Sequence, residues 1–240
     1  MSLQNRDRLI WIGLIVAWVL WWIRYPVSSN LKWKFLSWLL VIVIGVVCSN
    51  ILGRRSLRLF RTALATEDIP TAQREHANLA GFWKRRARET TKAFGINILL
   101  LEEKYQDALT QLEALDRRKL PKNAGPIIDN QIAWCLVQLG EPEKGMRIAQ
   151  SALPQLETMG RDYGASAHEV VGAGNVLVGN ASEAVPHLEQ ADASSKLPAI
   201  KASAAFYLGE AFSALNKTDE ARGAYRRACE ALPNENSPRS

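Results

Sequence analysis

Residues 207–233, YLGEAFSALNKTDEARGAYRRACEALP, decide the fold of this chain. A polar stretch, NKTDE at 216–220, separates two segments that are each long enough for a short helix. Small and apolar residues recur on both sides of it at the three- and four-residue spacing of a helix face that packs on a neighbour. The stretch therefore predicts two short helices joined by a turn.

The small and apolar residues of this region follow a fixed spacing. In residues 202–235 the pattern consists of Leu208, Gly209, Phe212, Ala221, Tyr225, Ala228 and Pro233. It resembles the 34-residue tetratricopeptide repeat, and only the leading Trp of that pattern is replaced, by Ala205. The resemblance implies that the small residues let two helices approach closely, while Phe212 and Tyr225 fill the space between neighbouring pairs.

The same frame, moved back along the chain, finds three weaker copies of the pattern. Four repeats are predicted within residues 89–235, with starts near residues 89, 126, 165 and 202. These starts are further apart than 34 residues, so lengthened loops between repeats are expected. No window shows the two-residue alternation of a strand, so the predicted class is an all-α solenoid. Residues 236–240 are expected to form a disordered tail.

The first fifty residues have a different composition from the repeats. The stretches LIWIGLIVAWVLWWI (9–23) and FLSWLLVIVIGVVCSNIL (35–52) contain no charged residue. At 1.5 Å per residue, the second is nearly long enough to cross the ~30 Å hydrocarbon core of a bilayer. Residues 1–53 are therefore predicted to form a transmembrane helical hairpin, with spans at about 9–25 and 35–53. A cleaved signal peptide is the alternative interpretation of the first stretch.

Positive charge is concentrated after the second predicted span. Residues 54–88 are predicted to be a basic helical linker, and its membrane-surface residues are expected to be Arg54, Arg55, Arg58 and Arg61. Six basic residues near one side of the bilayer against three near the other favour a cytoplasmic position for both termini. Residues 89–240 carry sixteen basic and twenty acidic residues, so nucleic-acid binding by this part lacks an electrostatic basis.

The order of two spans, a basic stretch and repeats is similar to that of bacterial haem-biosynthesis-associated membrane proteins. The likeness concerns architecture alone and covers no specific motif. It implies an integral, multi-pass protein of the bacterial inner membrane, with the repeat region in the cytoplasm.

Stacked repeats of this kind leave a concave groove that is lined by their first helices and binds peptides. The resemblance places eight residues in the groove: Asn130, Trp134, Gln138, Glu169, Ala173, Phe206, Glu210 and Ser213. The alternative is that Trp134 and Phe206 only pack between repeats. Co-chaperones of the family clamp a carboxylate with cationic side chains at places here taken by residues such as Asn130 and Tyr207. Recognition of a chaperone C-terminus is therefore not expected.

No catalytic, cofactor or metal site is expected, and the chain is not predicted to be an enzyme. His76, His168 and His187 are isolated in the sequence. GAGNVLVG at 172–179 lacks the spacing and the preceding strand of a dinucleotide-binding loop, so its glycines are expected at helix-packing positions.

The predicted function is that of a scaffold or adaptor that recruits or assembles protein partners at a membrane. The expected partners are a protein segment in the groove and the lipid bilayer, with neither nucleic acid nor a small-molecule substrate. The alternative is a structural subunit of a membrane complex whose hairpin is the main interaction element. In that case Gly45, Cys48 and Ser49 would form a small-residue packing face, and the repeats would dock or stabilise the complex.

Overall fold

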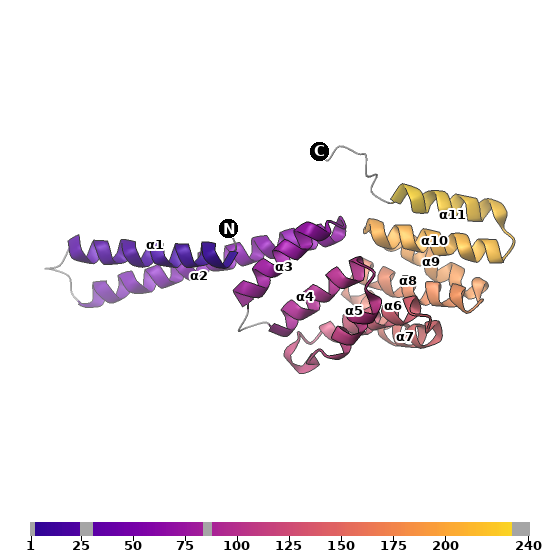
Figure 1. Cartoon of the computed structure of the whole chain (residues 1–240), viewed down its shortest axis with the longest axis horizontal. Coiled ribbons are helices and arrows are strands. Elements are labelled where there is room, and N and C mark those ends of the chain that lie inside the picture. Colours follow the sequence, from indigo (N-terminus) through magenta and orange to yellow (C-terminus); the bar gives the residue numbers. More distant parts are fainter. Residues whose placement is uncertain (1–2, 25–30, 84–87, 232–240) are drawn as a thin grey trace. The chain divides into compact units, whose positions relative to one another are not determined.

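A computed structural model describes residues 3–24, 31–83 and 88–231 of the chain. Within these ranges it contains eleven α-helices, one 3-10 turn and no β-strand (Figure 1). The predicted all-α class is therefore confirmed. Pro233, the predicted tail and residues 25–30 between the predicted spans lie outside the described residues.

The chain divides into two compact units. The first contains residues 1–63 and 68–91, and the second contains residues 64–67 and 92–240. The two predicted spans fall in the first unit, and most of the predicted repeat region falls in the second.

The first unit contains α1 (Leu3–Arg24), α2 (Leu31–Ala65) except for its last two residues, and α3 (Ile69–Trp83). Trp11 of α1 covers Gly45 of α2 so closely that a Cβ atom at Gly45 would lie 2.5 Å from the indole ring. Figure 1 shows α1 and α2 side by side. The second predicted span and the start of the basic linker therefore belong to one continuous helix, which packs on α1.

One helix of the described chain is long and apolar enough to cross a membrane. This is α2, over Leu39–Ala65, whereas α1 contributes only the shorter apolar stretch Arg8–Leu20. The structure thus provides one membrane-spanning candidate where the sequence predicted two. Both helices nevertheless expose large apolar side chains: Leu9, Ile12, Ile15, Val16, Val19 and Leu20 in α1, and Leu39, Leu40, Val43, Ile44, Val46, Val47 and Ile51 in α2.

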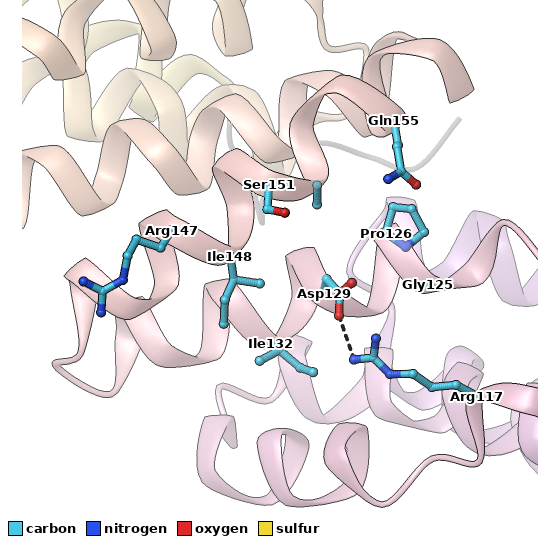
Figure 2. Close-up of a pocket in the computed structure, with 10 residues that line it drawn as sticks. Arg117, Gly125, Pro126, Asp129, Ile132, Arg147, Ile148, Ser151 and Gln155 are labelled. Atoms are coloured by element: carbon cyan, nitrogen blue, oxygen red, sulfur yellow. Dashed lines mark ion pairs between the residues drawn. The ribbon is translucent and has the colours of Figure 1, made fainter.

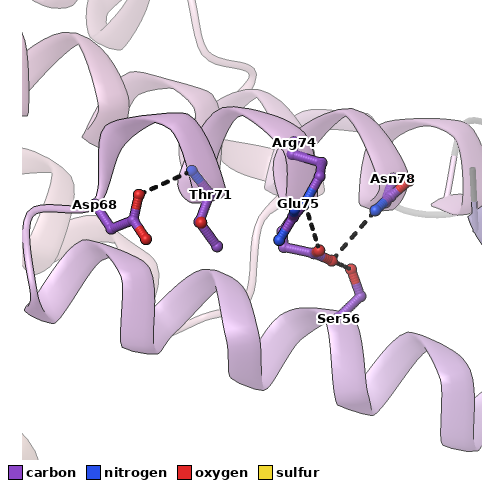
Figure 3. Close-up of polar contacts among 6 residues, drawn as sticks. All are labelled: Ser56, Asp68, Thr71, Arg74, Glu75 and Asn78. Atoms are coloured by element: carbon purple, nitrogen blue, oxygen red, sulfur yellow. Dashed lines mark hydrogen bonds and ion pairs between the residues drawn. The ribbon is translucent and has the colours of Figure 1, made fainter. Parts of the chain in front are cut away.

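Helices α2 and α3 are joined by a buried polar contact (Figure 3). Ser56 Oγ donates a hydrogen bond of 2.6 Å to Glu75 Oε2, and Asn78 Nδ2 donates one of 3.3 Å to the same oxygen. Asp68 caps the start of α3 by accepting a 3.1 Å bond from the Thr71 backbone N–H. The bonds from Ser56 and Asn78, with an ion pair of 3.4 Å from Arg74 Nε, give the buried carboxylate of Glu75 the partners that burial of a charged group requires.

The last turns of α2 have one cationic and one buried face. Ser56 and Phe60 are buried and contact Glu75 and His76 of α3. The exposed face carries the four predicted membrane-surface residues, Arg54, Arg55, Arg58 and Arg61. A cationic face therefore continues directly from the apolar part of the same helix.

Four helix pairs, together with residues 64–67, form the second unit, except that residues 88–91 at the start of the first pair belong to the first unit. They are α4 (Arg88–Leu101) with α5 (Tyr105–Glu113), α6 (Ala124–Gln138) with α7 (Pro142–Met159), α8 (Arg161–Leu177) with α9 (Ala181–Ser194), and α10 (Pro198–Ala214) with α11 (Thr218–Ala231). Each helix from α5 to α11 packs on the next, and α8 also contacts both α6 and α10. Consecutive helices therefore pack in a repeat-like series. A 3-10 turn, η1 (Arg117–Lys119), lies in the link between α5 and α6.

The two helices of every pair are joined by the same kind of turn. Four residues with positive φ mark these turns: Glu103, Gly140, Gly179 and Asn216. After each of them the next backbone N–H donates to the carbonyl five residues back, at 2.8–2.9 Å, which is the closure of a Schellman motif. Each of the four is the fifteenth residue counted from a predicted repeat start. The turns of the backbone therefore recur at the same position of each predicted repeat.

Glycine allows the close approach of paired helices. A Cβ atom at Gly209 of α10 would lie 2.4 Å from Tyr225 of α11, and one at Gly172 of α8 would lie 2.5 Å from Leu188 of α9. Real Cβ atoms do not come so near to other side chains in close-packed interiors. The two glycines occupy the same position of their predicted repeats, where the pattern calls for a small residue.

Candidate functional site

A cavity of about 460 Å³ lies within the second unit and is lined by the first helices of all four pairs. The helices α4, α6, α8 and α10 each contribute residues to its wall, and α5 adds Tyr105 at its start. We call this cavity the groove. Because α6, α8 and α10 pack side by side, the groove runs across successive pairs and is not confined to one of them.

Three of the eight residues predicted for the groove line it together. Asn130 and Trp134 come from α6 and Glu169 comes from α8. Asn130 is 6% exposed and Glu169 is 7% exposed, so both polar side chains lie deep in the wall. Trp134 is half-buried, with its ring edge-to-face to Tyr207 of α10 at 6.5 Å between ring centroids.

Two further predicted residues, on α6 and α8, are not among those that line the groove. Gln138 Nε2 donates a 3.2 Å hydrogen bond to Tyr207 Oη and so connects α6 with α10. Ala173 is fully buried and packs in the core with Val137 and Val170, where it offers no surface to a ligand.

The three predicted residues of α10 lie outside the groove lining. Phe206 is 47% exposed, and its ring lies 6.1 Å from that of Tyr225 on α11. Glu210 accepts a 2.6 Å hydrogen bond from Tyr225 Oη, and Ser213 is exposed. These side chains form a separate surface along α10 and α11.

The deepest part of the groove is rich in hydrogen-bond acceptors. Asn130 Nδ2 donates a 3.0 Å hydrogen bond to Ser166 Oγ, and Ser203 hydrogen-bonds to the carboxyl of Glu169. Asn130 Oδ1 is buried, and none of the described residues donates a hydrogen bond to it. A buried acceptor without a donor costs free energy, typically about 1–3 kcal/mol. We call Asn130, Ser166, Glu169 and Ser203 the acceptor cluster.

The ionisation of Glu169 is strongly perturbed by its position. Burial raises the pKa of this carboxyl from an ordinary value of 4.5 to about 8, and the hydrogen bond from Ser203 opposes the shift. Burial disfavours the charged form of a carboxyl group because the protein interior solvates charge poorly. Glu169 is therefore largely neutral at pH 7 when the groove holds no ligand.

The remaining charges of the groove are negative. Glu67 and Glu103 line it with Glu169, and no Lys or Arg is found among the described residues that line it. Burial, and then the negative charge of Glu103, raise the pKa of Tyr105 to about 12. A ligand entering the groove therefore meets acceptors and acids, flanked by the aromatic rings of Tyr105 and Trp134.

Several groove residues are not among those taken from the family pattern. Gln131 Nε2 donates a 2.9 Å hydrogen bond to Asn97 Oδ1, and both residues line the groove with Tyr105. Two other groove residues that the family pattern did not select, Ser166 and Ser203, could have been found from the sequence. Ser166 and Ser203 occupy the same position in consecutive predicted repeats, one turn from the residues that were selected.

A second cavity, of about 620 Å³, lies between η1, α6 and α7 (Figure 2). Arg117 Nη2 and Asp129 Oδ1 form an ion pair of 2.6 Å at its edge, and Ile132 and Ile148 contribute its apolar wall. This cavity is confined to one helix pair and its preceding link, whereas the groove crosses four pairs.

Two histidines that are isolated in the sequence are in contact in the structure. His168 of α8 and His187 of α9 place their Nδ1 atoms 2.8 Å apart, and His168 Nε2 lies 3.2 Å from Glu157 Oε1. The sequence did not indicate this contact, because the paired helices α8 and α9 bring together residues nineteen positions apart. Burial and then the proximity of His168 lower the pKa of His187 below its ordinary value. Across the described ranges, no three His, Cys, Asp or Glu side chains are arranged to hold a metal ion.

Comparison of the chain with protein-family models, with curated proteins and with solved structures returned no match. The resemblance to tetratricopeptide repeats therefore depends on the residues and the helix pairs of this chain alone.

Proposed function

We propose that this chain is a membrane-anchored scaffold or adaptor that binds a segment of a partner protein in its groove. The observation that supports this role best is the origin of the groove wall, because all four first helices contribute to it. A groove that crosses four pairs suits an extended peptide, which can contact each pair in turn. The role requires no enzymatic activity, cofactor or metal ion.

We further propose that α1 and α2 together anchor the chain in the bilayer as a hairpin. The packing of Trp11 on Gly45 and the exposed apolar side chains of both helices support this arrangement, since lipid solvates such surfaces and water does not. The exposed arginines that follow on α2 suit an anionic membrane surface. The excess of basic residues at this end of the spans favours a cytoplasmic second unit. The proposal of a bacterial inner membrane depends on the likeness of architecture alone.

The packing of α1 and α2 also bears on the alternative function. Gly45 is buried beneath Trp11, and Cys48 and Ser49 of the same helix are half-buried. Part of the small-residue face that was expected to contact other membrane proteins is therefore used within the first unit. This favours the repeats over the hairpin as the main interaction element.

Blocking the groove is expected to abolish partner binding. In the full-length protein, Ser203→Trp places a large ring at the groove wall, and Ser151→Trp places the same ring in the second cavity. Affinity capture in mild detergent should recover a defined partner with the unmodified protein and with the Ser151 variant. Recovery should fall at least tenfold with the Ser203 variant, because the new ring clashes with a bound partner. A tenfold loss of affinity corresponds to about 1.4 kcal/mol of binding free energy. Equal recovery with both folded variants would contradict a partner-binding groove.

A further inference from the structure

The acceptor cluster has an unusual combination of burial and unmet hydrogen-bonding capacity. Asn130 and Glu169 are both more than nine-tenths buried, yet they line a cavity that is open to a ligand. Asn130 uses its Nδ2 atom to donate to Ser166 Oγ and leaves its carbonyl oxygen without a donor among the described residues. The wall of the groove therefore contains an unpaired acceptor that is covered from solvent.

The charge of the surrounding wall limits which donors fit. Glu67, Glu103 and Glu169 line the groove, and its described lining contains neither Lys nor Arg. An anionic ligand would meet the carboxylates of Glu67 and Glu103 and no cationic side chain of this lining, whereas a cation would be attracted. The rings of Trp134 and Tyr105 in the same wall add faces that attract a cation.

We propose that the acceptor cluster is a binding site for the primary ammonium group of a partner polypeptide, supplied by a lysine side chain or by a chain N-terminus. An ammonium group has three N–H donors and no acceptor, which matches a site formed by a carboxyl, an amide carbonyl and hydroxyl oxygens. The inference rests on the proposed function, since it names the chemical group that the partner segment presents to the groove.

The site links binding to proton release. Ser203 of α10 hydrogen-bonds to Glu169, and Tyr105 of α5 interacts with it electrostatically. The other polar or charged residues of the same wall are Glu67, Asn97, Glu103, Asn130, Gln131 and Ser166. None of these described groups is a cation, so a bound ammonium supplies the positive charge that stabilises ionised Glu169. Binding below pH 8 therefore expels the proton of Glu169 to solvent.

The pH dependence separates the two sources of the ammonium group. A lysine side chain stays charged to about pH 10, so its affinity should rise roughly tenfold per pH unit up to about pH 8 and then level off. A chain N-terminus has an ordinary pKa of about 8 and loses its charge above that pH. Its affinity should therefore pass through a maximum near pH 8 and fall on the alkaline side.

The test uses the full-length protein in detergent micelles and small blocked probes. N-acetyl-lysine methylamide represents the side chain, alanine methylamide represents the N-terminus, and N-acetyl-norleucine methylamide and N-acetyl-arginine methylamide are the controls. Saturation-transfer NMR gives their affinities between pH 6 and pH 9. Infrared spectroscopy follows the carbonyl band of protonated Glu169, which should disappear as the ammonium probe binds and should be absent from the Glu169→Gln variant.

At least one ammonium probe is expected to bind more tightly than both controls. Glu169→Gln and Asn130→Ala are each expected to weaken that binding, roughly tenfold or more for loss of a charge-assisted hydrogen bond. Glu210→Gln, on the exposed face of α10, should leave it unchanged. The proposal is wrong if the norleucine or arginine probe binds equally well, or if binding survives both groove variants while they remain folded by circular dichroism. A partner that is still captured in that case would leave the groove function intact and remove only the ammonium site.

Discussion

Replacement of Gly145 by alanine is expected to destabilise the second unit by about 1–3 kcal/mol. Gly145 lies in α7, and a Cβ atom there would be 2.6 Å from the carbonyl oxygen of Ala133 and 2.7 Å from Val137 Cγ2. A side chain can rotate away from such a clash, but the backbone oxygen of α6 moves only if the whole helix shifts. The higher helix propensity of alanine offsets only about 0.5–1 kcal/mol of the loss.

The matched control for this change is Gly223→Ala in α11. Gly223 is also helical, but no atom lies within 4 Å of a Cβ placed on it. Alanine there should stabilise the helix by about 0.5–1 kcal/mol. Thermal unfolding of both full-length variants in mild detergent, followed by circular dichroism, measures the two effects. A Gly145 variant that melts at or above the temperature of the unmodified protein would show that α6 and α7 are not packed as described.

Replacement of Glu169 by glutamine is expected to remove a large pH dependence of stability. Folded Glu169 keeps its proton up to about pH 8, whereas in the unfolded chain the carboxyl loses it near pH 4.5. Between these values the folded state binds more protons than the unfolded state, so the free energy of unfolding falls as pH rises. The expected slope approaches 1.4 kcal/mol per pH unit, or about 2–3 kcal/mol between pH 5.5 and pH 7.5.

Glutamine has nearly the same shape as glutamic acid and no proton to lose in this range. The Glu169→Gln variant should therefore match the unmodified protein near pH 5 and exceed its stability increasingly towards pH 8. Chemical unfolding at a series of pH values provides the comparison, and Glu143→Gln at an exposed position of α7 is the matched control. Parallel pH profiles for the Glu169 variant and the unmodified protein would mean that this carboxyl is not buried as described.

The helix pairs could be predicted from the sequence because their signals are local. Position 209 requires a glycine because its backbone lies against Tyr225, sixteen residues later. Both residues fall within one predicted repeat. The turns are equally local, because a single positive-φ residue such as Gly140 ends each first helix. Packing within one repeat fixes which residue types recur, so a periodic search finds them.

The acceptor cluster could not be assembled from the sequence because it forms between repeats. Asn130, Ser166 and Ser203 come from three different first helices and meet only when the pairs stack. The family pattern did select Glu169 as a groove residue. It did not predict that Glu169 is buried or which residues surround it. How deeply Glu169 is buried depends on how far each helix pair is rotated against the next. That rotation produces no recurring residue pattern in the sequence.

The most direct test of a partner-binding groove is site-specific photo-crosslinking in native membranes. The photoreactive residue p-benzoylphenylalanine would replace Gln131 and Ile200 in the groove. As matched controls, called the outer positions, it would replace Ser151 and Gln155 in the second cavity. The account predicts that both groove positions crosslink to the same partner protein and that the outer positions do not. Crosslinks from the outer positions alone, or equally from all four, would contradict it.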